Sequence, residues 1–206
     1  MKAYAELKIS VSGLSECGRP ELVKALSKSL GLPVISIDFK SVYDAKQKFL
    51  KTKNTKDNLS DEGKDALKAW VQAYLDLLKT MNEKRSGLKG YILDRWELDL
   101  FALWLKDFAS FQVDKMTVNF LKQLTESAKE INYAAITPPL KLDEEEKLSE
   151  KPLTRPLCKR IDEVSVLRGL IGQYSRIVLI NLPMKKDAAE VRATTIKEAI
   201  DKNLKK

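Results

Sequence analysis

The chain contains no histidine among its 206 residues. This absence excludes catalytic triads with an imidazole base, histidine acid–base catalysis and zinc sites with imidazole ligands. Cysteine is scarce, and its two copies, Cys17 and Cys158, lie far apart in the sequence. Two cysteines cannot form a disulfide framework or a structural zinc site, so we expect a reducing, cytoplasmic environment.

Long apolar runs are also missing. No run approaches the roughly 20 apolar residues that a membrane-spanning helix needs, so we predict no membrane partner. An acidic residue, Glu6, comes early and no apolar stretch of signal-peptide length follows, so we expect no secretory signal. The chain is 44% apolar and 32% charged, which is typical of a folded domain, and we predict a single domain over residues 1–206.

Positive charge exceeds negative charge, with a formal net charge of +8. Such a surplus favours anionic partners, namely nucleotides, nucleic acid or an acidic face of a protein partner. The alternative is that the lysines only make the exposed surfaces of helices soluble and bind no anionic partner.

Strand-like and helical patterns alternate along the chain, which is typical of a parallel α/β sheet. Strands are expected at about 5–12, 32–38, 91–94, 131–137 and 176–181. Helices are expected at about 20–30, 40–53, after a capping Ser60, at about 96–108, at about 115–129, after residue 156 and at about 187–203. Residues 140–156 are polar and contain two prolines, so we predict a lid-like segment at about 140–170.

Three tryptophans, Trp70, Trp96 and Trp104, are candidates for stacking on nucleic-acid bases. Leucine and phenylalanine recur around them at helical spacing, which favours burial in the core instead.

A glycine-rich turn joins the first strand to the first helix. Gly13 and Gly18 have the spacing of the phosphate-binding pattern G-x-x-x-x-G-K-[ST], but Arg19 replaces its lysine and Pro20 its hydroxyl residue. Backbone N–H groups of such a loop and the following helix N-terminus face phosphate. The alternative is a glycine turn with a purely structural role.

Acidic residues follow the second and third expected strands. Asp38 could accept the proton of an attacking hydroxyl group, or it could cap a turn or helix. Asp94 could hold a metal ion and Arg95 could clamp an acceptor phosphate. Alternatively, Asp94 caps the next helix and Arg95 pairs with Glu97 or Asp99.

Basic residues gather around the predicted lid, at Arg155, Lys159, Arg160 and Arg168. Lid arginines can neutralise a phosphoryl group during transfer. A solvent-exposed basic helix face is the alternative.

Together these motifs resemble the nucleoside/nucleotide kinase group of P-loop proteins, which includes the ribosylnicotinamide-kinase-like and polynucleotide-kinase-like enzymes. The resemblance rests on Gly13 and Gly18, on Asp38, on Leu93-Asp94-Arg95, and on the strand and prolines at 134–139. It implies a three-layer α/β/α P-loop NTPase fold with a five-stranded parallel sheet in the order 2-3-1-4-5. It also implies transfer of the γ-phosphate of ATP, or of another nucleoside triphosphate, with Mg²⁺.

The resemblance assigns roles by position. Asp38 would be the base, Asp94 the metal carboxylate and Arg95 the acceptor clamp, while Arg155 and Arg160 would be lid arginines. The residues that would face the nucleotide phosphates are Gly13, Ser15, Cys17, Gly18 and Arg19.

Three functions remain open at this point. The first is an ATP-dependent kinase that acts on a nucleoside, a nucleotide or a nucleic-acid end. The second, motivated by Glu16, Arg19 and Pro20 in one loop, is a kinase fold that has lost catalysis and binds nucleotide or protein. The third, motivated by the net charge of +8, is a nucleic-acid-binding protein without phosphoryl chemistry.

Overall fold

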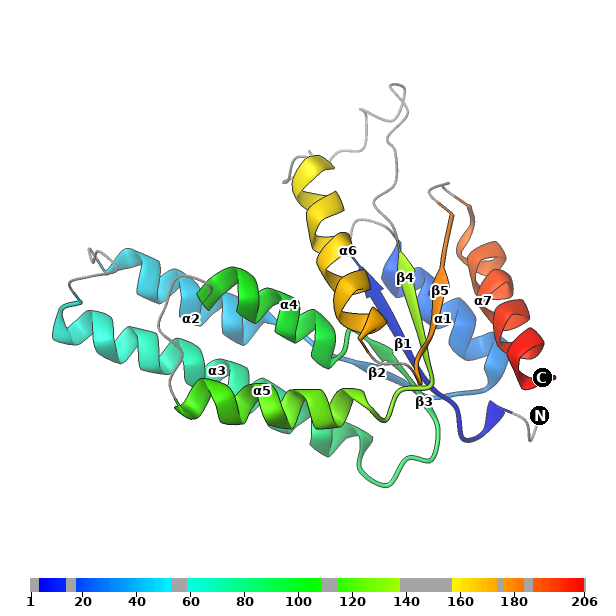
Figure 1. The fold of residues 1–206 in the computed structure, drawn as a ribbon, viewed down its shortest axis with the longest axis horizontal. Coiled ribbons are helices and arrows are strands. Elements are labelled where there is room, and N and C mark those ends of the chain that lie inside the picture. Colours follow the sequence, from blue (N-terminus) through cyan, green and yellow to red (C-terminus); the bar gives the residue numbers. More distant parts are fainter. Residues whose placement is uncertain are drawn as a thin grey trace.

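The fold is a five-stranded parallel sheet with helices on both faces (Figure 1). The computed structural model describes residues 4–13, 18–52, 59–108, 115–137, 157–173, 176–183 and 187–205. The strand order is β2-β3-β1-β4-β5. This confirms the expected order and the three-layer α/β/α architecture.

The elements match the expected ones closely. The strands are β1 (Lys8–Gly13), β2 (Val34–Ser36), β3 (Tyr91–Asp94), β4 (Tyr133–Thr137) and β5 (Val178–Asn181). The helices are α1 (Arg19–Leu30), α2 (Lys40–Lys51), α3 (Asp61–Arg85), α4 (Glu97–Phe108), α5 (Lys115–Ala128), α6 (Leu157–Gly172) and α7 (Ala189–Leu204). The first strand begins later than expected, because the backbone N–H of Leu7 donates to the carbonyl of Tyr4 in a turn.

The alternation of side chains along the strands divides the core into two apolar clusters. Ile9 and Val11 of β1 belong to the cluster under α1 and α7. Ser10 and Ser12 therefore face the other side, where α3, α4, α5 and α6 cover the sheet. Both serines are buried, so the sheet face under these helices has a polar strip along β1.

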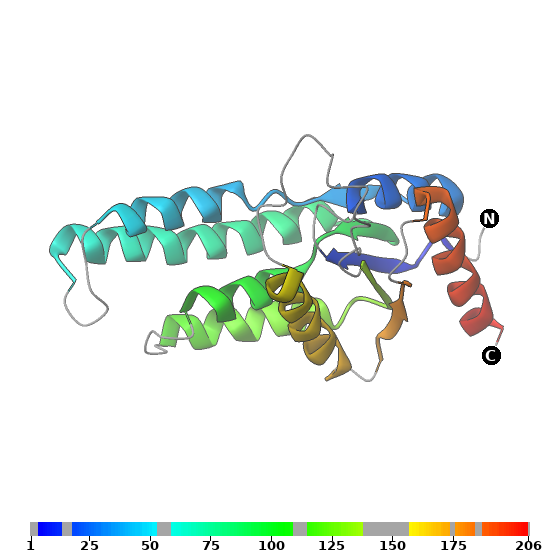
Figure 2. The ribbon, with the colours of Figure 1, turned by 90° about the horizontal axis from the view of Figure 1, so that it is seen from above.

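Four helices, α2 to α5, extend beyond the sheet as an arm (Figures 1 and 2). Its interior is aromatic: the ring centroids of Trp104 and Phe120 lie 4.5 Å apart, and those of Tyr74 and Trp104 lie 4.9 Å apart. Asp107 is buried among these rings, where it accepts a hydrogen bond from Tyr74 Oη at 2.7 Å and pairs with Lys46. Aromatic packing and this buried polar contact together hold the arm as one body.

Several local expectations are confirmed. Ser60 caps α3 through a hydrogen bond from the Gly63 backbone N–H at 3.1 Å. Trp70, Trp96 and Trp104 are all buried, as their spacing predicted, so they are not surfaces for stacking bases. None of the helices in the described ranges has the length and hydropathy that a bilayer span requires.

The register of the sheet brings the strand ends together where the glycine loop begins. Val11 lies opposite Asp94, and Gly13 lies opposite Thr137. Thr137 Oγ1 donates to the carbonyl of Ser12 at 2.9 Å, which ties the end of β4 to the end of β1. Gly13 has φ 118°, and a β-carbon there would lie 2.1 Å from Thr137 Oγ1. Glycine is therefore required by both conformation and space.

Replacing Gly13 with alanine is expected to destabilise the fold by about 3 kcal/mol, because strain and steric overlap add. Gly31 offers a matched control, since it has φ 70° but a β-carbon at this position would meet no heavy atom within 4 Å. Gly31→Ala is expected to cost about 1 kcal/mol from strain alone. Urea unfolding of both variants measures the difference, and equal losses would show that the close approach to Thr137 has no energetic consequence.

Candidate functional site

The candidate site lies at the carboxyl ends of β1, β3 and β4, beside the N-terminus of α1. Ligands of open α/β sheets bind at this edge. Gly18 is the N-cap of α1 and adopts a left-handed conformation, φ 64° and ψ 33°, without a capping side-chain hydrogen bond. Gly13 and Gly18 thus form the two ends of the loop, while Ser15 and Cys17 lie outside the described residues.

Arg19 is turned toward the sheet. Its Nε donates to Asp94 Oδ1, and its Nη1 donates to the carbonyl of Gly13. The Arg19 side chain is 5% exposed and that of Asp94 is 14% exposed, so this ion pair is nearly removed from water. The cation predicted to face phosphate and the carboxylate predicted to hold metal therefore bind each other.

Asp99 is a second carboxylate at this edge, which the sequence analysis considered only as a possible partner of Arg95. Its Oδ2 accepts hydrogen bonds from Ser12 Oγ at 2.8 Å and from the Trp96 backbone N–H at 3.1 Å. Burial raises the pKa of Asp99 above its ordinary value of 3.8, although the positive charges of Arg19 and Arg95 act in the opposite direction. Two carboxylates and two guanidinium groups thus share the strand ends, and their charges offset one another.

Arg95 has an unusual backbone conformation. It is the single non-glycine residue with positive φ, at 71°, among those the structure describes. Its backbone N–H donates to the carbonyl of Val11 at 3.2 Å, and its guanidinium carbon lies 4.9 Å from the centroid of the Phe39 ring. Such backbone strain costs about 1–3 kcal/mol and concentrates at functional sites. These contacts hold Arg95 just beyond the end of β3, which lies between β1 and β2 in the sheet.

Asp38 is exposed beyond the end of β2. Its Oδ1 accepts a hydrogen bond from the Lys40 backbone N–H at 2.9 Å, so one carboxylate oxygen caps the start of α2. Asp38 therefore has the turn or capping role that the sequence offered as the alternative, and its role as a base remains a prediction.

The structure describes only part of the predicted lid. Arg155 lies outside the described residues, and the side chain of Arg160 on α6 is not among those described. Arg168, further along α6, is exposed. Leu167 and Leu170 pack into the core beside the sheet, so this part of α6 is anchored.

The described residues do not fit the usual magnesium site of a phosphate loop. Pro20 offers neither a hydroxyl group nor a backbone N–H, and Asp94 is occupied by Arg19. Within the described ranges, no three acidic or sulfur side chains gather closely enough to hold a metal ion.

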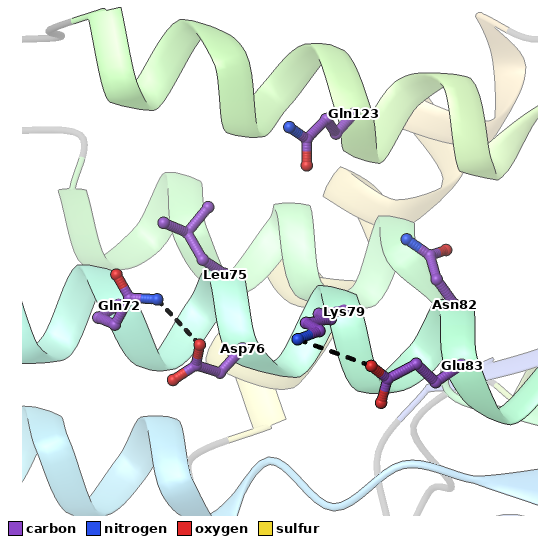
Figure 3. Close-up of a pocket in the computed structure, with 7 residues that line it drawn as sticks. All are labelled: Gln72, Leu75, Asp76, Lys79, Asn82, Glu83 and Gln123. Atoms are coloured by element: carbon purple, nitrogen blue, oxygen red, sulfur yellow. Dashed lines mark hydrogen bonds and ion pairs between the residues drawn. The ribbon is translucent and has the colours of Figure 1, made fainter.

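A groove of about 370 Å³ lies elsewhere, on the arm between α3 and α5 (Figure 3). Some of its polar side chains on α3 pair with one another: Gln72 donates to Asp76 at 2.9 Å, and Lys79 pairs with Glu83 at 3.8 Å. Gln123 of α5 faces them across the groove. The groove does not include the strand ends and is separate from the candidate site.

Comparisons with known proteins identify the fold. No family model and no curated protein matches the sequence of this chain. Among solved structures, deoxyadenosine kinase from M. mycoides with bound dCMP has a TM-score of 0.59 at 12% identity, covering 95% of this chain and 99% of that chain. NadR in complex with NR has a TM-score of 0.51 at 11% identity, covering 96% of this chain and 50% of that chain. YorR from Bacillus subtilis with phosphorylated GDP has a TM-score of 0.50 at 14% identity, covering 94% and 95%.

These identities show similarity of fold alone. The chain shares the three-layer α/β/α fold of these structures, one of which is a nucleoside kinase. The expected kinase-like fold is thereby confirmed, and the subgroup within it stays a prediction.

The buried pair predicts a large effect on stability. Asp94→Asn is expected to destabilise the protein by about 3 kcal/mol, because it leaves the Arg19 charge without its carboxylate. The combined change Arg19→Met with Asp94→Leu is expected to restore stability to within about 1 kcal/mol of wild type. Urea unfolding gives these values.

The control is Asp65→Asn, which breaks an exposed pair with Lys68 at 3.6 Å and is expected to cost under about 0.5 kcal/mol. A similar small loss for Asp94→Asn would show that the Arg19–Asp94 pair does not stabilise the fold.

The raised pKa of Asp99 predicts that the free energy of unfolding depends on pH. Because its folded pKa is raised above 3.8, the folded state binds this proton more tightly than the unfolded state does. Its contribution to stability is therefore largest below 3.8 and falls as pH rises through the folded pKa. Relative to Asp99→Asn, wild type should lose free energy of unfolding as pH rises above 3.8 and through the folded pKa of Asp99. Urea unfolding at a series of pH values tests this, and an opposite slope would contradict it.

Proposed function

We propose that this chain binds a nucleotide by its phosphates at the loop between β1 and α1, and that it does not catalyse efficient Mg²⁺-dependent phosphoryl transfer. The fold and its nucleotide-binding structural relatives support the first part. Gly13 and Gly18 supply the backbone geometry that such a loop needs, next to the N-terminus of α1.

The second part of the proposal rests on one observation, the ion pair between Arg19 and Asp94. In an active phosphate loop, a lysine reaches the β- and γ-phosphates and a hydroxyl group holds Mg²⁺. Here the loop cation donates to Asp94 and to the Gly13 carbonyl, and Pro20 has no hydroxyl. Removing positioned charge from phosphoryl transfer costs several kcal/mol of transition-state stabilisation, on the order of 3 for one donor.

A second candidate is a kinase that transfers the γ-phosphate of ATP to a nucleoside, a nucleotide or a nucleic-acid hydroxyl. Two residues just beyond the strand ends favour it. Asp38 is exposed, and Arg95 lies over the ring of Phe39, the residue that follows Asp38 in the chain. A carboxylate near an arginine is suited to an acceptor that carries a hydroxyl and a phosphate.

Calorimetric titration with ATP, once with Mg²⁺ and once with EDTA, tests the proposal. We expect similar affinity in both, because Arg19 already binds Asp94 and Pro20 offers no hydroxyl group to the ion. The variant Arg19→Lys with Pro20→Thr restores the loop residues and is expected to bind ATP more tightly with Mg²⁺ than without it. ATP binding by wild type that needs Mg²⁺, or no ATP binding at all, would overturn the proposal.

A transfer assay with labelled γ-phosphate separates the two candidates. Nucleosides, nucleotides and DNA ends serve as acceptors, and we expect no label on any of them. Label on an acceptor that disappears with Asp38→Asn would establish the kinase instead.

A further inference from the structure

The two halves of α2 are anchored to the rest of the protein in different ways. The helix lies along α3 in the arm (Figures 1 and 2). Phe39, at its N-cap position, and Val42, in its first turn, are both buried. None of residues 44–51, which the structure describes throughout, is buried. Apolar burial therefore fixes the start of α2, and its second half depends on other interactions.

Lys46 is the polar anchor of this second half. Its Nζ pairs with Asp107 of α4 and lies 5.5 Å from the centroid of the Trp70 ring of α3. The Lys46 side chain is 26% exposed, whereas that of Asp107 is completely buried. Phe49 is half-buried, with its ring centroid 5.4 Å from that of Trp70. Through Lys46, the second half of α2 is joined to both α3 and α4.

The two partners of Asp107 come from different helices. Tyr74 Oη of α3 donates to its Oδ2 at 2.7 Å, and this contact does not involve α2. The cation that compensates the charge of Asp107 comes from α2, through Lys46. A buried carboxylate without a cation is costly, and water that reached it would lower this cost. Loss of the Lys46 charge would therefore favour a state in which the second half of α2 has moved away from Asp107.

We propose that the Lys46–Asp107 pair is a latch that holds the second half of α2 closed, and that this half opens locally in a minor state by pivoting about Val42. The open state exposes Asp107 and the Trp70 ring to solvent, and it leaves Phe39 in place beside the strand ends. Local opening of this kind is drawn from segments with few buried apolar contacts. The inference goes beyond the proposed function, since it does not depend on nucleotide binding.

Hydrogen exchange of individual backbone amides, followed by NMR on the full chain, tests the latch. In wild type, amides of residues 46–51 should exchange faster than those of Tyr74 and Leu78, which lie in the buried part of α3. In Lys46→Met, exchange of residues 46–51 is expected to rise about 10- to 100-fold, the effect of losing a hydrogen bond to a charged group. Exchange in α1 and β3 should not change.

Lys48→Met is the matched control, because it makes the same substitution at an exposed position of the same helix. It should leave the exchange of α2 unchanged. Asp107→Asn removes the charge and keeps an oxygen that can accept from Tyr74. It should therefore raise the exchange of residues 46–51 as Lys46→Met does.

Equal exchange of α2 in Lys46→Met and Lys48→Met would overturn the proposal. A rise that extended equally to α1 would also overturn it, because it would indicate global unfolding. If neither Lys46→Met nor Asp107→Asn folds, wild type decides: exchange of residues 46–51 that is no faster than that of Tyr74 and Leu78 would show that α2 does not open on its own.

Discussion

The ion pair between Arg19 and Asp94 connects the parts of the fold that meet at the candidate site. Arg19 is the first residue of α1, and Asp94 is the last residue of β3. The same guanidinium group also holds the carbonyl of Gly13, where β1 ends. Because both side chains are nearly excluded from water, each charge depends on the other for stabilisation. The contact therefore fixes the direction in which the chain leaves the loop, and it also decides which charges remain for a ligand.

The distribution of charge around this pair differs from what the net charge of +8 suggests. At the strand ends, Asp94 and Asp99 offset Arg19 and Arg95, so the surplus does not lie there. Much of the lysine content lies on exposed helix surfaces, as in the pairs that Lys64 and Lys79 form along α3. Such pairs contribute little, about 0–1 kcal/mol each, and they do not define a binding surface. The overall excess of positive charge therefore does not by itself indicate a phosphate site at the strand ends.

The fold could be predicted from sequence because its signals are local. Alternation in β1, with Ile9 and Val11 between serines, and the glycine that ends α1 each report on a few neighbouring residues. The pairing of Arg19 could not be predicted in this way, since its partner lies 75 positions away and reaches it only through the register of Val11 with Asp94. Asp99 did leave a readable signal, because an acid on a helix with apolar residues on several faces must find a buried partner. The pair of Lys46 with Asp107 likewise joins residues 61 positions apart, which no local pattern reports.

The stability of the Arg19–Asp94 ion pair limits how a bound nucleotide could rearrange the site. Removing one partner from a buried ion pair costs about 3–5 kcal/mol, whereas a hydrogen bond from a charged donor contributes about 1.5–3 kcal/mol. A ligand shifts a conformational equilibrium only by the difference between its affinities for the two states. A phosphate that drew Arg19 away from Asp94 would thus gain less than the separation costs, and Asp94 would be left buried without its cation. We therefore expect Arg19 to stay with Asp94 when the loop is occupied.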